Sequence, residues 1–464
     1  MVSTTRGFLP RADPIVTLPP EFDPLESILQ RMPVKTASGA PGLLAEGKLG
    51  DVVLSSLPDL TDHINKYASN LPLMNALYRD YSFLLSAYLL EPCHLRFMKG
   101  EPYGLARDVL PACIARPIKR CADLTGFQPF MEYAGSYALY NYTLTSPSLP
   151  LTSPNNLRLI RAFTHGLDPS SSEAGFVLVH ILMVSHSPLL ISSTLSSLSS
   201  AHSHLRSPFN TSLSGILTSL RQVNKSMETM WQRSKPTSYT SFRTFIFGIT
   251  SQSMFPDGVL YEGIPEYDGK RQSFRGESGA NDSMIPLMDN FLGVEMPDTP
   301  LTEILKDFRR YRPDNHREFI EWVKHRRDEL GVKQWALGGG GGGGGGGGED
   351  ATVGDDDDDE DKKETKRLWL KLLDQVREFR WRHWCFAREY ILKQTSHPTA
   401  TGGSPIVTWL PNQLGAVLAE MERIYADDRD NLGEEIEGIM DLVKRQKEML
   451  NKEVKKFCEE RGVN

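Results

Sequence analysis

Apolar residues recur at helical spacing along most of the chain. Leu71–Leu90 places large apolar side chains at every third or fourth position, which predicts an amphipathic helix. Gly175–Leu190 is almost wholly apolar and is expected to form a buried helix. Asn431–Arg461 combines a charged face with an apolar stripe, so it should pack on the body of the protein or against a partner helix. Because no region is rich in strand signals and no repeat has a fixed period, the pattern predicts an all-α protein.

The helical pattern divides into a small part and a large part. Residues 1–20 are polar and rich in proline, and we expect a loosely held, flexible arm. Residues 21–125 contain several amphipathic segments separated by Pro and Gly signals, which predicts a small helical N-terminal domain. Residues 126–464 contain the longer apolar segments and are expected to form a large helical C-terminal domain.

An insertion interrupts the large domain at about residues 338–363. Gly338–Gly348 is an unbroken glycine run, and Asp355–Asp361 is an unbroken acidic run. Neither composition can bury apolar surface, so the segment as far as Lys363 is expected to be disordered. The glycine run does not predict a phosphate-binding loop, because it lacks the GK[ST] ending and a preceding strand.

Composition excludes several classes of protein. The net charge of −7, without a basic stripe, argues against binding to nucleic acid. The five cysteines are scattered and form no CxxC pair, so we expect reduced thiols and a cytoplasmic protein. The first twenty residues lack an apolar signal segment, and no run of eighteen apolar residues occurs, so no membrane span is expected.

One histidine stands out by its surroundings. As a helix, Phe379–Leu392 places His383 on a face with large apolar side chains, where burial would keep the imidazole neutral and able to bind a metal. A lone histidine on an apolar face is more often a hydrogen-bonded core residue. No His or Glu lies three or four residues further on, so a zinc or di-iron helix is not indicated. A haem, which takes one proximal histidine from a helix, remains possible.

The sequence of this helix, FRWRHWCFAREYIL, resembles the proximal-histidine helix of the indoleamine 2,3-dioxygenase family. Four further blocks resemble that family in the same order: YEG at Tyr261–Gly263, FRGESGANDS at Phe274–Ser283, DFRRYRPDNHREF at Asp307–Phe319 and TGGS at Thr401–Ser404. Several independent blocks in order are far more specific than any one alone. The resemblance covers roughly residues 19–421.

The resemblance implies a haem dioxygenase that inserts O2 across the indole C2–C3 bond of L-tryptophan. The product would be N-formylkynurenine, at the first step of the kynurenine pathway. The implied cofactor is haem b, with ferrous iron in the active form. The implied partners are L-tryptophan, dioxygen and an electron donor, with no nucleic acid and no membrane, and a monomer is expected.

The resemblance also assigns residues near the haem. His383 matches the proximal iron ligand. Asp289 and Arg380 match an ion pair near the haem and its propionates, although an ordinary helix–helix salt bridge would look the same in sequence. Ser278 and Gly279 match small residues over the haem edge, where a bulky side chain would exclude the indole.

On the substrate side, Arg243 matches the arginine that holds the substrate carboxylate, and Thr401 matches the threonine of a mobile loop that closes over the amino acid. Tyr133 and Phe176 match aromatic residues that flank the indole, although tyrosines near Tyr133 could equally serve packing alone. Ser238 and Tyr239 both stand where the family usually has Phe. These two replacements make this part of the pocket more polar.

His180 is the most informative departure from the family pattern. The indoleamine enzymes typically have serine here, whereas the related tryptophan 2,3-dioxygenases place a distal histidine in the equivalent pocket. We expect His180 to accept a hydrogen bond from the indole N–H and so to orient the ring. The alternative is a core histidine that faces away from the haem.

Two other functions remain open. The first is a haem-binding sensor or carrier of the same fold with little or no turnover, which the polar substitutions near Arg243 allow. The second is a helical scaffold without a cofactor, which requires every motif match to be accidental. Haem absorbance excludes the scaffold, and formation of formylkynurenine separates the enzyme from the sensor.

Overall fold

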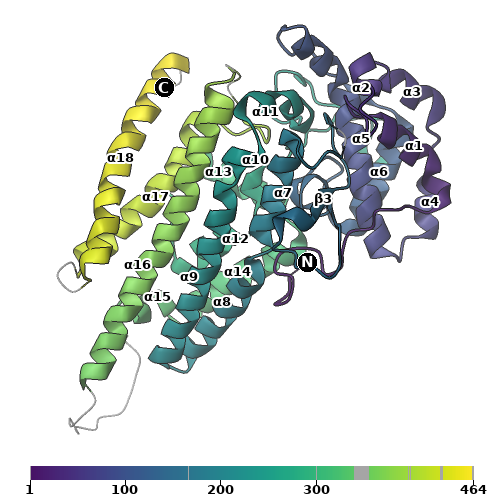
Figure 1. The fold of residues 1–464 in the computed structure, drawn as a ribbon. Helices are drawn as coiled ribbons and strands as arrows, with labels where there is room; N and C mark the ends of the chain where they lie inside the picture. The colour runs from purple at the N-terminus through teal and green to yellow at the C-terminus, as the bar shows by residue number, and fades with distance from the viewer. Residues whose placement is uncertain are drawn as a thin grey trace.

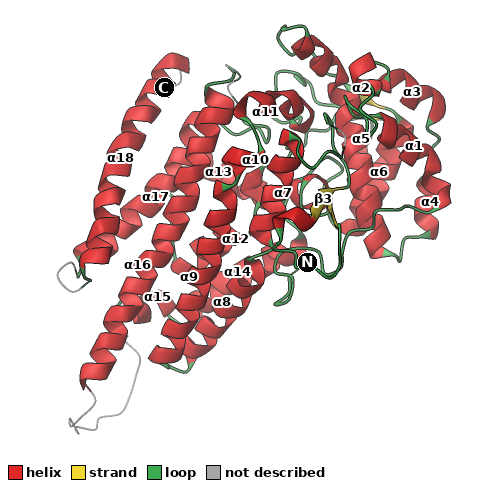
Figure 2. Ribbon diagram, viewed as in Figure 1, coloured by secondary structure: helices red, strands yellow, loops and turns green. Residues whose placement is uncertain are grey.

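The structure is a computed structural model, and it describes residues 2–165, 167–298, 300–338, 355–395, 397, 399–428 and 432–461. Helices dominate this part of the chain, in agreement with the predicted all-α class (Figures 1 and 2). The strands are two short pairs. β1 (Val109–Leu110) runs parallel to β4 (Leu260–Tyr261), and β2 (Tyr142–Leu144) runs antiparallel to β3 (Leu157–Leu159).

The N-terminal helices surround one long central helix, α5 (Leu71–Met98), at one side of the molecule (Figure 1). The others are η1 (Pro20–Phe22), α1 (Asp23–Arg31), α2 (Leu43–Glu46), α3 (Leu49–Ser56), α4 (Thr61–Lys66) and α6 (Ala112–Thr125). The side chain of Asn70 caps the start of α5, and most residues of α5 are buried. Glu91 of α5 accepts hydrogen bonds from the backbone N–H groups of Leu49 and Gly50, and so caps the start of α3.

The larger part begins with the π-helix η2 (Tyr133–Tyr137) and ends with two long helices at the opposite side (Figure 1). Its elements are η3 (Pro154–Asn156), α7 (Ser172–Val184), α8 (Ser187–His202), α9 (Arg206–Glu228), α10 (Met230–Arg233), α11 (Pro236–Arg243), η4 (Thr244–Ile246), η5 (Pro265–Tyr267), η6 (Gly279–Asn281), α12 (Met284–Leu292), α13 (Pro300–Arg309), α14 (Asp314–Glu329), α15 (Val332–Ala336), α16 (Asp355–Phe386), η7 (Ala387–Leu392), α17 (Ile406–Ala426) and α18 (Glu434–Arg461). α16 packs along α9 and α17, which holds its C-terminal end in the interior.

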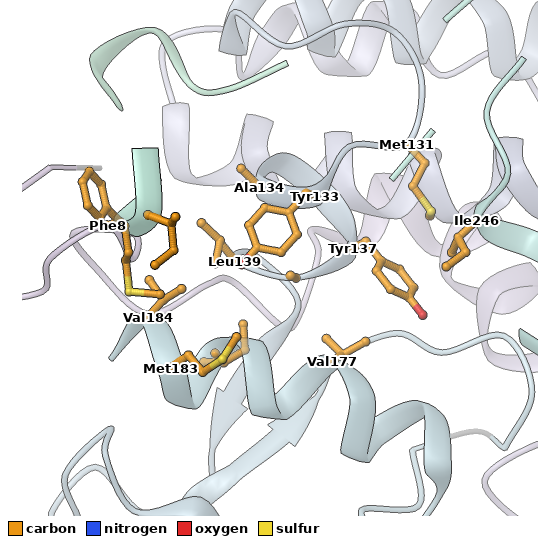
Figure 3. Close-up of a cluster of buried hydrophobic side chains, with 14 of the residues drawn as sticks. Phe8, Met131, Tyr133, Ala134, Tyr137, Leu139, Val177, Met183, Val184 and Ile246 are labelled. Atoms are coloured by element: carbon orange, nitrogen blue, oxygen red, sulfur yellow. The ribbon is translucent and has the colours of Figure 1, made fainter. Parts of the chain in front are cut away.

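One apolar cluster runs through both parts. Figure 3 shows Tyr133 and Tyr137 of η2 in the same cluster as Val177 and Met183 of α7. Ser172–His202, which joins α7 and α8, is long and apolar enough to cross a membrane by composition, but 72% of its most apolar window is buried inside the protein, as in a core helix. Because the core is continuous, the division at about residue 125 stays a prediction.

Two expectations need correction. The predicted arm at residues 1–20 is not loosely held from residue 2 onward, because Phe8 and Leu9 are buried, and Phe8 lies in the cluster of Figure 3. The Phe8 N–H also donates to Ser187 Oγ at 2.9 Å. Asp355–Lys363 is not disordered, because it forms the first turns of α16. The Asn210 side chain donates to the Asp361 carbonyl at 2.9 Å, so α9 holds these turns in place. The remainder of the predicted insertion, from residue 339 to 354, lies outside the described residues.

Candidate functional site

Two cavities meet at His383, near the C-terminal end of α16. The larger has a volume of about 690 Å³ and reaches past α12 to α14. The smaller, of about 130 Å³, lies between α7, α11 and η7. Their shared lining consists of Gly279, Ala280, His383, Trp409 and Leu410. A volume of 300–1,000 Å³ is usual for sites that hold a cofactor or a drug-sized ligand, and the larger cavity falls within that range.

His383 is held in the form that binds metals. It occupies the last turn of α16, directly before the π-helix η7, and such π-turns occur frequently at functional sites. Burial, together with smaller effects of the nearby His180 and Arg380, lowers the pKa of His383 to about 4. The imidazole is therefore neutral at pH 7. Its ring is half-buried because it forms part of the cavity wall.

The larger cavity offers polar groups that lack partners. Arg380 Nη2 donates to Asp289 Oδ2 at 2.6 Å, so these side chains form the ion pair that the family resemblance implies. Among the described residues, Arg380 Nη1, Asp289 Oδ1 and Arg312 Nε are buried without a hydrogen-bond partner. Burial first raises the pKa of Asp289, and Arg380 acts in the opposite direction.

These features fit a haem. A haem needs one neutral imidazole on its iron, cations near its two propionates and an apolar surround. His383 provides the first, and the unpaired N–H groups of Arg312 and Arg380 can provide the second. Trp409 and Leu410, which line both cavities, contribute to the third.

The smaller cavity collects most of the substrate residues predicted from the sequence. Its lining includes Phe176, His180, Tyr239, Ser278, Gly279 and Thr401. The ring centroid of Phe176 lies 5.0 Å from that of His180 and 5.2 Å from that of Tyr239. Tyr133 lines neither cavity, but packs edge-on against His180 with ring centroids 5.8 Å apart.

The tautomer of His180 follows from its backbone contact. Its Nδ1 lies 2.9 Å from the Phe176 carbonyl oxygen, which can only accept, so Nδ1 carries the hydrogen. Nε2 is then a free acceptor, and a Cβ built on Gly279 would lie 3.6 Å from it. Burial lowers the pKa of His180, although the bond to Phe176 opposes this shift. A methyl group at position 279 would therefore lie in van der Waals contact with this nitrogen.

Arg243 lies behind the cavity instead of in its wall. It is fully buried at the end of α11, where Nη2 donates to the Thr399 carbonyl at 2.8 Å and the guanidinium stacks on Phe247 at 4.5 Å. Its Nε and Nη1 have no partner in the part of the chain that the structure describes. Thr401 Oγ1 donates to the Glu277 carbonyl at 2.8 Å. The 399–401 segment thus separates Arg243 from the cavity.

Two residues of the site, Glu277 and Arg312, were not predicted from the sequence. Glu277 lines the smaller cavity, where burial raises its pKa to about 8. Burial also lowers the pKa of Arg312, to about 10, and its Nη2 donates to the Ala280 carbonyl at 3.0 Å. One signal was available for Glu277, namely an acid within the glycine-rich stretch RGESGA. Arg312 had none, because it is one of several arginines in RRYR.

One family of known proteins matches most of this chain. Residues 1–438 match the family model described as indoleamine 2,3-dioxygenase. The indoleamine 2,3-dioxygenase of Saccharomyces cerevisiae is 27% identical over 292 residues, which cover 58% of this chain and 62% of the yeast protein. Indoleamine 2,3-dioxygenase 1 of Mus musculus is 26% identical over 316 residues, covering 67% of this chain and 70% of the mouse protein.

A third relative is similar to the same degree. The 6-hydroxytryptophan 2,3-dioxygenase of Fusarium equiseti is 25% identical over 328 residues, which cover 70% of this chain and 72% of that protein. The family model spans most of the chain, and the all-α fold agrees with it. The chain therefore belongs to the indoleamine 2,3-dioxygenase family.

Proposed function

We propose that this protein is a haem dioxygenase that inserts O2 across the C2–C3 bond of an indole amino acid, with L-tryptophan giving N-formylkynurenine. The observation that carries the proposal is the neutral imidazole of His383, which lies where a large cavity with unpaired arginine N–H groups meets a small aromatic cavity. Bound haem would supply the binding and activation of dioxygen.

The residues around His383 would hold and orient the cofactor. His383 would bind the iron, while Arg380, positioned by Asp289, and Arg312 would neutralise the propionates. The apolar residues shared by both cavities would keep water away from the reacting face.

The smaller cavity would position the substrate. Phe176 and Tyr239 would flank the indole ring, and the free Nε2 of His180 would accept a hydrogen bond from its N–H. Arg243 has two unpaired donors for the substrate carboxylate, which become accessible if the 399–401 segment shifts. Ser278 and Gly279 would leave room for the ring.

The proposal also covers the electron donor, the compartment and the oligomeric state of the enzyme. Turnover needs an electron donor that keeps the iron ferrous, and the protein is proposed to act as a cytoplasmic monomer. The five cysteines are unpaired in the structure, which supports a reducing compartment.

The test combines absorbance and product formation. Purified wild type should bind haem stoichiometrically with a Soret band and, with a reductant and oxygen, convert L-tryptophan to N-formylkynurenine. His383→Ala should lose stable haem binding, whereas the control His186→Ala should keep it, because His186 contacts Ser226 and lines neither cavity. Stable haem without product would favour the sensor or carrier, and a normal ferrous spectrum of His383→Ala would contradict the proximal assignment.

A further inference from the structure

The C-terminal helix α18 has one face that the proposed reaction does not use. α18 lies at the edge of the molecule and packs along α17 (Figure 1). Near its end, Glu453, Phe457 and Arg461 each follow four residues after the one before, so they lie on the same side of the helix. Arg461 also lies beyond the residues that match the family, so the family match assigns it no role.

This face of α18 is fixed to the helix that carries His383. Glu453 Oε2 accepts from Trp384 Nε1 at 2.6 Å, and Glu453 Oε1 accepts from Arg388. The ring of Phe457 packs edge-on against that of Trp384, with centroids 6.1 Å apart. Trp384 directly follows His383 in the sequence. The last turns of α18 are therefore held in register with the end of α16.

Arg461 extends this contact to the backbone that follows η7. Its Nη2 donates to the carbonyl groups of Leu392 at 2.9 Å and Thr395 at 2.8 Å, and its Nη1 donates to the His397 carbonyl at 3.3 Å. Leu392 is the last residue of η7, where carbonyl groups lack partners within the helix. One guanidinium thus holds the end of η7 and the beginning of the segment that leads to Thr401.

The backbone that Arg461 holds continues to Arg243. The Nδ1 atom of His397 lies 3.2 Å from the Thr399 carbonyl oxygen, which can only accept, so the imidazole donates. The same carbonyl accepts from Arg243 Nη2 at 2.8 Å. This contact keeps the 399–401 segment between Arg243 and the smaller cavity. A continuous series of hydrogen bonds therefore joins the end of α18 to the arginine that would bind the substrate carboxylate.

Building on the proposed function, we propose that Arg461 is a positioning residue that keeps the 399–401 segment over Arg243 until a substrate carboxylate displaces it. Arg461 lines neither cavity, so it acts through His397 and Thr399. Its hydrogen bonds stabilise the arrangement in which Arg243 is covered. They therefore reduce the fraction of molecules in which Arg243 can bind a carboxylate.

The test compares two ligands that differ in the carboxylate. Binding of L-tryptophan and of tryptamine is measured with the full-length, haem-loaded ferric protein by the change in haem absorbance. Arg461→Met removes the hydrogen-bond donors but keeps a long side chain. It should bind L-tryptophan roughly three- to tenfold more tightly than wild type does, because the covered arrangement is weakened. The affinity for tryptamine, which does not need Arg243, should stay the same.

Arg461→Lys is the conservative variant. Its ammonium group keeps the charge and can still donate to some of the carbonyl groups, so its affinity for L-tryptophan should lie between those of wild type and Arg461→Met. Arg445→Met is the matched control on the same helix. Arg445 is exposed and donates to the Asp441 carbonyl of α18 itself at 3.3 Å, so its loss should change neither affinity.

A second measurement does not depend on ligand binding. Hydrogen–deuterium exchange of the full-length protein, followed by mass spectrometry, reports the opening of the backbone between residues 392 and 404. Exchange in this segment should be several-fold faster in Arg461→Met than in wild type, and unchanged in Arg445→Met. Exchange in α9, which is remote from Arg461 in sequence and packs along α16, should be the same in all three proteins.

Three results would overturn the proposal. The first is an affinity of Arg461→Met for L-tryptophan that is unchanged or weaker, and the second is an equal change for both ligands, which would indicate a general effect on stability. The third is unchanged exchange between residues 392 and 404. If Arg461→Met does not fold, the same criteria apply to Arg461→Lys. Failure of the proposed function looks different, because wild type would then bind no haem or no indole amino acid, while exchange would still report the contact of Arg461.

Discussion

At the scale of single residues, the site depends on which groups are charged. His180 and His383 are both neutral because burial disfavours the imidazolium ion, and each keeps a ring nitrogen available. Arg312, by contrast, remains a cation, and it forms no ion pair with a carboxylate in the part of the chain that the structure describes. The cofactor side therefore combines a neutral imidazole with cationic arginines.

The neutral state of His180 predicts the pH profile of the reaction. The pKa of His180 lies below its ordinary value of 6.5, so the acceptor is present at neutral pH and is lost only as the pH falls through this lowered value. Activity with L-tryptophan should therefore be retained at pH 6.5 and decline only as the pH falls through the lowered pKa of His180. His180→Ser should flatten the decline and raise relative activity on 1-methyltryptophan, which has no N–H. An unchanged ratio of the two activities would show that His180 does not face the indole nitrogen.

Removal of the Arg312 cation should change the haem more than the fold. Arg312→Met should lower the midpoint potential of the iron, because a nearby positive charge favours the ferrous form. The effect should be on the order of 1–2 kcal/mol, the interaction of charges roughly 10 Å apart at an effective dielectric constant near 20. Arg309→Met is the control, since Arg309 lines the same cavity but is 44% exposed. Equal potentials in wild type and Arg312→Met would place this cation away from the propionates.

At the scale of elements, α11 and the 399–401 segment act together on the carboxylate site. The last residue of α11 is Arg243, and its bond to the Thr399 carbonyl occupies one of its donors while two remain free. The Thr401 hydroxyl ties the same segment to the loop before η6. Substrate binding should thus exchange a backbone contact of Arg243 for a carboxylate contact.

This exchange predicts the behaviour of Arg243→Ala. The KM for L-tryptophan should rise by an amount equivalent to roughly 2–5 kcal/mol, the usual cost of removing one partner of a buried ion pair with a ligand. The KM for tryptamine, which has no carboxylate, should change far less, and the haem spectrum should stay the same. Equal increases for both compounds would indicate a structural role for Arg243.

At the scale of the whole molecule, a buried ion network joins the two parts of the chain. Asp80 of α5 accepts from Arg79 at 2.8 Å and from Arg161, beyond β3, at 2.9 Å. Burial by itself would raise the pKa of Asp80, but the two arginines outweigh it and lower the pKa to about 2. The network therefore stabilises the fold above about pH 4, and this stabilisation is lost as the pH falls towards 2.

Asp80→Asn should accordingly destabilise the protein by roughly 3–5 kcal/mol, because it leaves the fully buried Arg79 without a counter-charge and Arg161 with Glu26 alone. Asp13→Asn is the control. Asp13 pairs with Arg6 at 2.6 Å but is 50% exposed, and its loss should cost at most about 1 kcal/mol. Free energies from urea unfolding at pH 7 test this, and similar values for the two variants would contradict it.

The local sequence pattern predicted the long helices. It did not predict the features of the fold that depend on tertiary contacts. α5 and α7 follow from their own apolar residues, and the helix of His383 was predicted with its cavity-facing side. The acidic start of α16 was missed because α9 holds it, a contact with no local signal. Burial of Phe8 was missed for the same reason.

The site was predicted unevenly for a related reason. Motif matches indicated most of the residues that the structure brings to the two cavities. They could not indicate that Arg243 lies behind the 399–401 segment, since the conformation of a side chain depends on the residues that pack around it. They also could not indicate Glu277, whose importance comes from burial without a partner.

The two cavities share one narrow boundary, formed by residues around His383 and η6. A flat cofactor on His383 would complete the floor of the smaller cavity. Binding should then be ordered, with haem first and the amino acid second, since the substrate cavity is incomplete before haem binds. Tryptophan should consequently raise the melting temperature of the haem-loaded protein and leave that of the apoprotein nearly unchanged. In a cell, the supply of haem would then determine how much of the protein can respond to its substrate.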